Sequence, residues 1–256
     1  MIILSIDIGI KNLALCISDV KYDISNNILN TNIIDWKIIN LIETIICQET
    51  KSCKCNAKFF INKKDISNNE FKLFLCNKHS NKYDKNLINK FKNENSNVIS
   101  LINLSDNIIK YLDLYFQDLR EKKNFKISNI DNIIIENQIG PLAIRMKSIQ
   151  ALITMYFVYN SNKNIEYINS TNKLKYFTEK TTTYKERKKK SVEITKNLLE
   201  NNIENLYNLN NTNNKNIINI NDENKIWLSE FNSNSKKDDL ADCLLQLFYF
   251  SIQKLL

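Results

Sequence analysis

Apolar and polar positions along the 256-residue chain fall into short β-branched runs and longer helical patterns. A continuous apolar run of four to eight residues is typical of a buried strand, and two such runs joined by a tight turn predict a hairpin. The expected strands are residues 1–8, 13–20, 33–46, 132–137 and 164–170. The first two of these strands predict such a hairpin, and the third is expected to end in a short helical segment. The fourth predicts a central strand buried on both faces.

Apolar residues at helical spacing predict four helices. Ser105 and Asp106 could divide the first, and the third is expected to begin near Tyr184. Gly140-Pro141 is the strongest turn signal, and the Asn-rich stretch 205–224 predicts loop or disorder. The expected helices are residues 98–120, 142–159, 181–202 and 236–256. A hairpin followed by alternating strands and helices predicts an α/β fold with a mixed sheet flanked by helices.

Residues 47–95 differ from the rest, because they are rich in Lys and Asn and show little periodicity. We interpret them as a small insert, which leaves residues 1–46 and 96–256 as one main domain. The start of the chain shows no signal-peptide pattern, so we expect an intracellular protein without disulfides. Cys16 and Cys243 lie in apolar patterns and are interpreted as buried small hydrophobic residues.

Composition narrows the function further. The apolar fraction of 43% and aromatic fraction of 10% exclude a disordered chain. No apolar run approaches the roughly 18 residues that would span a bilayer, so we expect no membrane partner. The formal charge of +8 favours a polyanionic partner such as nucleic acid, although an A/T-rich genome would also enrich lysine.

Four carboxylates follow the predicted elements in order. Asp7 lies in the first strand, Glu136 ends the central strand, and Asp239 and Asp242 stand three residues apart on one face of the last helix. Each alone could be structural, and Asp238 is a neighbour that competes with Asp239. Together they would repel one another unless a divalent cation supplied the opposing charge. Carboxylate oxygens are ligands that Mg²⁺ prefers, and two such ions can activate water against a phosphodiester.

Four segments carry a family resemblance: SIDIGIKNLALCI, IIIENQ, YKERKKKSVE and KKDDLADCLLQ. In this order they resemble the RuvC-like Holliday junction resolvases of the ribonuclease H superfamily, and IENQ…MKSIQAL looks closest to the poxvirus and giant-virus branch. The resemblance covers residues 1–45 and 130–250.

The resemblance implies a ribonuclease H-like mixed sheet and a virus-encoded protein that acts in the infected host cell, in DNA recombination and repair. It implies a homodimeric endonuclease that makes paired nicks in four-way or branched DNA using two Mg²⁺ ions. The metal-binding carboxylates would be Asp7, Glu136, Asp239 and Asp242.

The basic run 185–190 is interpreted either as a solvated helix face or as a phosphate contact. The family places a lysine near the start of this helix, and Lys189 is its best match, while Lys185 and Lys188 stay open. Further candidates for contact with nucleic acid are Lys11, Asn12, Arg145, Lys185, Arg187 and Lys188.

Cysteine and histidine cluster within the insert. Cys53-x-Cys55 and Cys76-x₂-His79 predict a structural Zn²⁺ site with four protein ligands. The first pair is tighter than usual, and Cys47 could replace Cys53. Unligated thiols are the alternative. However, an insert with so few apolar residues usually needs a structural metal or a disulfide to stabilise it. The insert could serve a dimer contact or junction binding.

Three other functions are alternatives. Another ribonuclease H-like nuclease, acting on RNA–DNA hybrids or branched DNA, would use the same carboxylates. A non-catalytic nucleic-acid binder on this fold would be expected to lose some of them. A sugar kinase or actin-like ATPase needs a second glycine-rich phosphate loop, which Gly9 and Gly140 cannot supply.

Overall fold

The computed structural model describes residues 1–42, 44–93, 99–140, 144–161, 163–178, 183–200, 217–220 and 224–255. The chain forms two compact units. Unit 1 comprises Met1–Leu41 and Ser105–Leu256, and unit 2 comprises Ile42–Leu104. Unit 2 therefore extends beyond both ends of the insert expected over residues 47–95.

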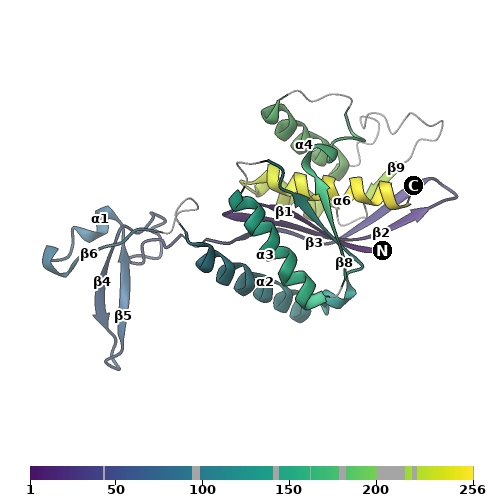
Figure 1. The fold of residues 1–256 in the computed structure, drawn as a ribbon. Coiled ribbons are helices and arrows are strands. Elements are labelled where there is room, and N and C mark those ends of the chain that lie inside the picture. The colour runs from purple at the N-terminus through teal and green to yellow at the C-terminus, as the bar shows by residue number, and fades with distance from the viewer. Residues whose placement is uncertain are drawn as a thin grey trace. The chain divides into compact units, whose positions relative to one another are not determined.

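Unit 1 is built on a six-stranded mixed sheet in the order β8-β7-β1-β2-β3-β9 (Figure 1). The hairpin strands β1, β2 and β3 are antiparallel to one another, whereas β7 lies parallel to both β1 and β8. The mixed α/β prediction is therefore confirmed. The strands are β1 (Ile2–Ile8), β2 (Asn12–Asp23), β3 (Ile28–Asn40), β7 (Asn132–Asn137), β8 (Asn164–Asn169) and β9 (Ile217–Ile220).

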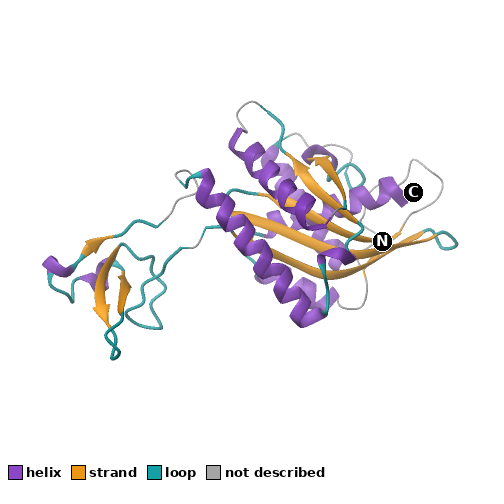
Figure 2. Cartoon of the chain, turned by 60° about the horizontal axis from the view of Figure 1, so that its bottom comes forward, coloured by secondary structure: helices purple, strands orange, loops and turns teal. Residues whose placement is uncertain are grey.

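Helices cover both faces of this sheet (Figures 1 and 2). On one face α6 crosses β1, β2 and β3, and α4 and α5 pack against α6. On the other face lie α3 and the part of α2 that belongs to unit 1. The helix α2 runs unbroken through Ser105 and Asp106, so these residues do not divide it. The helices are α2 (Leu101–Lys123), α3 (Ile144–Ser161), α4 (Tyr184–Leu199), α5 (Asn224–Ser233) and α6 (Lys237–Leu255).

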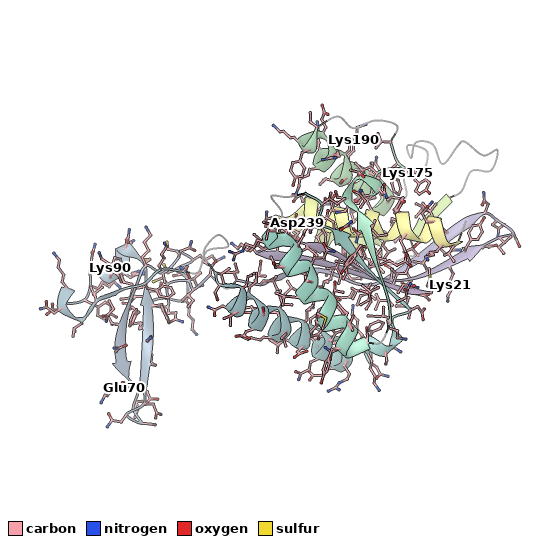
Figure 3. All side chains as sticks on the ribbon, in the orientation of Figure 1. Lys21, Glu70, Lys90, Lys175, Lys190 and Asp239 are labelled. Carbon is pink, nitrogen blue, oxygen red and sulfur yellow. The ribbon has the colours of Figure 1, made fainter. Side chains whose placement is uncertain are left out.

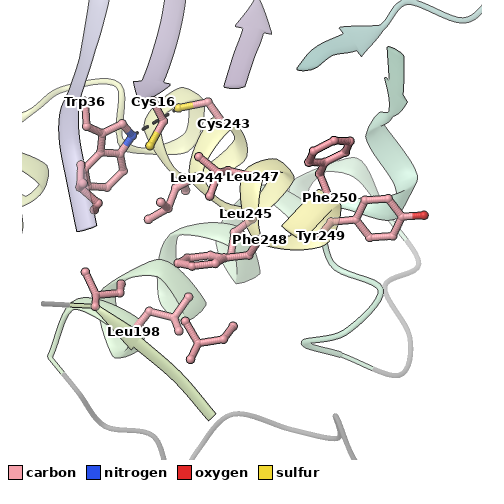
Figure 4. Close-up of a cluster of buried hydrophobic side chains, with 14 of the residues drawn as sticks. Cys16, Trp36, Leu198, Cys243, Leu244, Leu245, Leu247, Phe248, Tyr249 and Phe250 are labelled. Atoms are coloured by element: carbon pink, nitrogen blue, oxygen red, sulfur yellow. Dashed lines mark hydrogen bonds between the residues drawn. The ribbon is translucent and has the colours of Figure 1, made fainter. Parts of the chain in front are cut away.

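The core between the sheet and α6 fixes the start of that helix (Figure 4). Trp36 of β3 stacks on Phe231 of α5, with ring centroids 5.4 Å apart. The indole Nε1 of Trp36 donates to the Leu240 carbonyl at 3.1 Å and approaches the Cys243 sulfur at 3.3 Å. Cys16 and Cys243 are fully buried, as predicted, and burial raises the pKa of the Cys16 thiol to about 12.

Two expectations about the sheet are wrong. The third strand, expected over 33–46, forms over 33–40 but begins earlier, at Ile28, and ends at Asn40, and the described residues from 41 to 46 form no helix. The stretch expected to be loop contains β9, whose Ile218 and Ile220 are buried beside β3. The remainder of that stretch, 205–216 and 221–223, lies outside the described residues, as do Pro141 and Leu142. Gly140 is described, and its φ of 120° suits the predicted turn.

Unit 2 is a small antiparallel sheet in the order β5-β4-β6. The ring of Phe74 contacts those of Phe60 and Phe91, with centroid distances of 6.1 and 4.8 Å respectively. Its elements are β4 (Phe59–Lys64), β5 (Glu70–Leu75), α1 (Asn77–Ser80), a 3₁₀ turn (Lys85–Leu87) and β6 (Asn89–Lys90). Across the described parts of both units, no helix is long and apolar enough to span a membrane.

Candidate active site

Asp7 and Glu136 lie side by side because their strands are parallel and in register. Ile6 of β1 pairs with Ile135 of β7, so the next residue of each strand is a carboxylate. Side chains alternate between the two faces of a strand, and both carboxylates therefore point toward α6. This places two acidic groups at the carboxyl ends of neighbouring buried strands.

A third parallel strand adds a cation to this edge. After β8 the chain makes one 3₁₀ turn (Ser170–Asn172) and presents Lys173, which is almost fully buried. Its Nζ lies 2.6 Å from Asp7 Oδ1, 2.9 Å from Glu136 Oε1 and 3.5 Å from an oxygen of Asp242. The three carboxylates thus surround one buried ammonium group.

The helix α6 delivers the remaining carboxylates from its first turns (Figure 3). Asp242 reaches Lys173, while Asp239 lies 3.5 Å from Lys188 Nζ of α4. Lys188 also pairs with Asp238. One turn beyond Asp242, Gln246 is fully buried and donates to the Ser5 hydroxyl and the Ile6 carbonyl, both at 3.2 Å. Together with the Trp36 bond, this contact fixes α6 against the sheet beside the carboxylates.

These groups open onto a cavity of about 420 Å³. Its lining includes all four predicted carboxylates and Lys173, and Arg187 and Lys188 stand on the α4 side. Gly9 lines it as well, and a Cβ at that position would lie 2.5 Å from the Asn12 carbonyl oxygen. The turn after β1 therefore requires glycine, because any side chain there would clash with the Asn12 backbone.

Charge is unevenly compensated in this cavity. Burial, with the nearby Glu136 and Asp242 charges, raises the pKa of Asp7 well above its usual value despite the opposing effect of Lys173. For Lys173, burial lowers the pKa, but the surrounding carboxylates outweigh it and the net shift is upward. Burial and Asp238 likewise raise the pKa of Asp239. The lining holds four carboxylates against the three cations Lys173, Arg187 and Lys188, which leaves a net negative charge that favours a divalent cation.

The predicted basic residues divide into two groups. Arg187 and Lys188 line the cavity, whereas Lys185 and Lys189 are exposed on α4 outside it. The lysine that the carboxylates surround is Lys173, whereas Lys189, the best match in sequence, lies outside the cavity. The lining does not include the other three candidates, Lys11, Asn12 and Arg145.

Sequence reasoning missed Lys173 although a signal existed. The predicted strand 164–170 is parallel to its neighbour, so the residues that follow it had to reach the same edge as Asp7 and Glu136. Lys173 and Lys175 both follow that strand, and only the 3₁₀ turn decides which of them points inward.

A second cluster lies in unit 2. The ligand atoms of Cys47, Cys53, Cys76 and His79 all lie within 4.8 Å of one another. Cys47 Sγ is 3.1 Å and Cys76 Sγ 3.5 Å from His79 Nδ1, and the Cys53 and Cys76 sulfurs are 4.0 Å apart. Tetrahedral zinc places two sulfurs about 3.8 Å apart and sulfur and nitrogen about 3.6 Å apart. The cluster therefore matches the spacing of a Cys₃His zinc site.

The cluster differs at one position from the ligand set predicted from spacing. Cys55 is exposed and outside the cluster, and its carbonyl accepts a hydrogen bond from the Cys47 amide at 2.8 Å. Cys47 is buried and fills the fourth position. Cys47 thus replaces Cys55, and not Cys53 as the sequence alternative had it.

No family model matches the chain. Uncharacterized protein L451 of Acanthamoeba polyphaga mimivirus is 28% identical over 338 aligned positions, which cover 98% of this chain and 74% of that protein.

Two solved structures are resolvases of the kind that the sequence motifs resemble. Fowlpox virus resolvase with Holliday junction DNA has a TM-score of 0.43 and 18% identity, over 99% of both chains. Thermus thermophilus RuvC has a TM-score of 0.44 and 8% identity, over 99% of this chain and 96% of that one. Likeness at this level carries no argument about function, which must come from the residues of this chain.

Proposed function

We propose that this protein is a structure-selective endodeoxyribonuclease that resolves four-way DNA junctions with Mg²⁺. The observation that carries the proposal is the convergence of Asp7, Glu136 and Asp242 on the single buried ammonium group of Lys173. The carboxylates come from two parallel strands and one helix, and they face an open cavity.

The donor set fits magnesium. Each candidate ligand offers hard carboxylate oxygens, which Mg²⁺ prefers, and the lysine already occupies a place where positive charge is stabilised. Asp7, Glu136, Asp239 and Asp242 would hold two ions. Bound there, the ions would supply an activated water and stabilise the leaving oxygen of a phosphodiester.

Lys173 acts in this proposal as a positioning residue. Its Nζ is within 3 Å of both Asp7 and Glu136, so it sets the separation of the two strand carboxylates and lowers their mutual repulsion. The side-chain Nε2 of Gln138 donates to the other carboxylate oxygen of Glu136, Oε2, at 2.8 Å and fixes the rotation of that carboxylate.

Arg187 and Lys188 would contact the DNA backbone on the α4 side of the cavity. Phosphate contacts position a strand without reading its sequence, which suits recognition of a junction by its shape. Paired nicks require two such sites, and we propose that a homodimer supplies them, as the family resemblance implies.

We further propose that the Cys47, Cys53, Cys76 and His79 cluster binds one structural Zn²⁺. Four protein ligands leave no open position for a reacting water. The cluster joins the loop before β4 to the start of α1, and so would stabilise a unit with few buried apolar residues.

Incubation with a four-way junction, a nicked duplex and an RNA–DNA hybrid, each with and without added Mg²⁺, tests the main proposal. We expect symmetric cleavage of the junction only when Mg²⁺ is present. Preferential cleavage of the hybrid would instead favour the other ribonuclease H-like activity. Tight junction binding without cleavage of any substrate would favour the non-catalytic binder.

A further inference from the structure

Unit 2 carries a basic groove that the nuclease site does not use. The groove has a volume of about 570 Å³ and is open to solvent. It lies between the residues that enter β4 and those that follow β6. Its lining includes Asn56, Lys58, Phe59, Lys90, Phe91 and Lys92, and none of the described residues that line it is acidic.

The three lysines of this groove are exposed. Within the described residues, no carboxylate lies within salt-bridge range of Lys58, Lys90 or Lys92. Elsewhere in the unit, Lys64 pairs with Glu70 and Lys82 with Glu49. Like charges gathered at one hollow repel each other, and they favour an anion that carries repeated charge.

The unit as a whole has the same bias. Residues 42–104 contain eleven lysines and six acidic residues, which leaves a formal charge of +5 with His79 neutral. The whole chain has +8. Most of the net positive charge therefore belongs to a unit that holds none of the proposed catalytic carboxylates.

Aromatic rings stand among these lysines. Phe91 lines the groove and is half-buried, with its ring held edge-on against Phe74 at 4.8 Å. Phe59 lines the same groove at the start of β4. A ring fixed from behind and open in front can stack on an unpaired base, while lysines on either side contact phosphates.

The walls of the groove form one hydrogen-bonded ladder beside the metal cluster. The Phe91 amide donates to the Lys58 carbonyl and the Lys58 amide to the Leu75 carbonyl, both at 2.8 Å. Leu75 immediately precedes Cys76 of the cluster. The Asn93 side chain donates to the carbonyls of Ile45 and Ala57 at 3.2 and 3.0 Å. The groove is therefore a shaped surface rather than a set of independent lysines.

We propose that this groove binds a single nucleic-acid strand, with phosphates on Lys58, Lys90 and Lys92 and an unpaired base on Phe91. The proposal goes beyond the nuclease function, because it needs neither the carboxylates nor Mg²⁺. An acidic peptide would use the lysines but gains little from the ring.

The test measures binding of a fluorescent single-stranded oligonucleotide to the full, zinc-loaded chain without Mg²⁺, over a series of salt concentrations. The groove variant carries Lys58→Gln, Lys90→Gln and Lys92→Gln together. The control variant carries Lys51→Gln, Lys64→Gln and Lys85→Gln, which removes the same charge from exposed positions of the same unit outside the groove.

We expect the groove variant to bind the oligonucleotide at least about tenfold more weakly than the parent chain. The slope of log affinity against log salt concentration should become shallower by about two, because three phosphate contacts are lost. The control should bind within about twofold of the parent chain. Phe91→Leu should weaken the oligonucleotide about tenfold with an unchanged salt slope. Zinc content and the thermal midpoint of unfolding identify any variant that fails to fold. If Phe91→Leu fails to fold, the comparison of the two lysine variants decides the test.

Equal losses in the groove and control variants would overturn the proposal, because the effect would then be one of total charge. Competition by polyglutamate as effective as that by the oligonucleotide would also overturn it in favour of an acidic peptide. Junction cleavage is not measured in this assay, so its result and that of the nuclease test are independent.

Discussion

Lys173 Nζ lies 2.6 Å from Asp7 Oδ1, with both side chains buried at the ends of non-adjacent strands. The strand β7 lies between β1 and β8, and its Glu136 accepts from the same ammonium group. One lysine thus links three neighbouring parallel strands at the edge where the carboxylates meet. Removing Lys173 would leave the surrounding carboxylates buried without their shared cation.

Lys173→Met tests this relationship. Loss of one partner of a buried ion pair destabilises a protein by about 3–5 kcal/mol. We expect a lower urea midpoint for the variant, and we expect added Mg²⁺ to restore more stability to it than to the parent chain. Lys189→Met, at an exposed position outside the cavity, should change stability by less than about 0.5 kcal/mol. An equal effect of the two substitutions would argue against the buried cluster.

The raised pKa of Asp7 predicts a pH-dependent metal site. Burial and neighbouring carboxylates keep a proton on Asp7 to a higher pH than on an ordinary aspartate, whose pKa is about 3.9. The proton competes with Mg²⁺, so the affinity for Mg²⁺ should fall as the pH is lowered from about 8 to about 5. Calorimetric titrations in two buffers of different ionisation enthalpy would also show proton release on binding. A Kd for Mg²⁺ that stays constant over this range would contradict the prediction.

The metal cluster of unit 2 offers a matched pair of substitutions. Cys47→Ser removes a ligand, and we expect the purified variant to lose its zinc and to unfold more readily. Cys55→Ser changes an exposed thiol eight residues away and should keep about one zinc per chain. Elemental analysis of the two proteins gives the answer. Zinc retained by Cys47→Ser and lost by Cys55→Ser would restore the ligand set that spacing alone predicted.

Trp36→Phe tests how the start of α6 is positioned. Phenylalanine keeps a ring against Phe231 but loses the hydrogen bond to the Leu240 carbonyl, worth about 1 kcal/mol. Because Leu240 lies between Asp239 and Asp242, we expect kcat for junction cleavage to fall about tenfold with little change in junction affinity.

Trp227→Phe is the control for this substitution. Its indole is also buried, but its Nε1 has no hydrogen-bond partner within the described residues. It should leave kcat within about twofold, because no positioning bond is lost. Equal kcat values for the two variants would show that the Trp36 bond does not position the carboxylates.

The carboxylates could be predicted from sequence because each sits at a position where a charge is anomalous. Asp7 and Glu136 interrupt apolar runs, and Asp239 and Asp242 share one helix face. No sequence pattern distinguishes Lys173, because a lysine that follows a strand is usually exposed. Its burial can be inferred only once the conformation of the turn that follows the strand is known. Its inward direction depends on the 3₁₀ turn and on three strands meeting, which are tertiary facts.

The same limit explains the other corrections. Cys47 and Cys55 are equivalent by residue type, and only the pairing of the Cys47 amide with the Cys55 carbonyl turns one side chain inward and leaves the other outside. The strand β9 is four residues in an Asn-rich stretch, and its burial depends on the neighbouring edge of β3. Local pattern therefore predicts the main elements, while long-range pairing decides these details.

Cleavage of a four-way junction by Asp7→Asn in the presence of Mg²⁺ tests the central claim most directly. Asparagine keeps the shape of the side chain but loses the charge, and Asp19→Asn on β2, outside the cavity, controls for a general effect. We predict that Asp7→Asn binds the junction like the parent chain but cleaves it at least about a hundredfold more slowly, since even groups behind metal ligands are worth 10- to 100-fold. Cleavage by Asp7→Asn at the parental rate would contradict the assignment of these carboxylates as the catalytic centre.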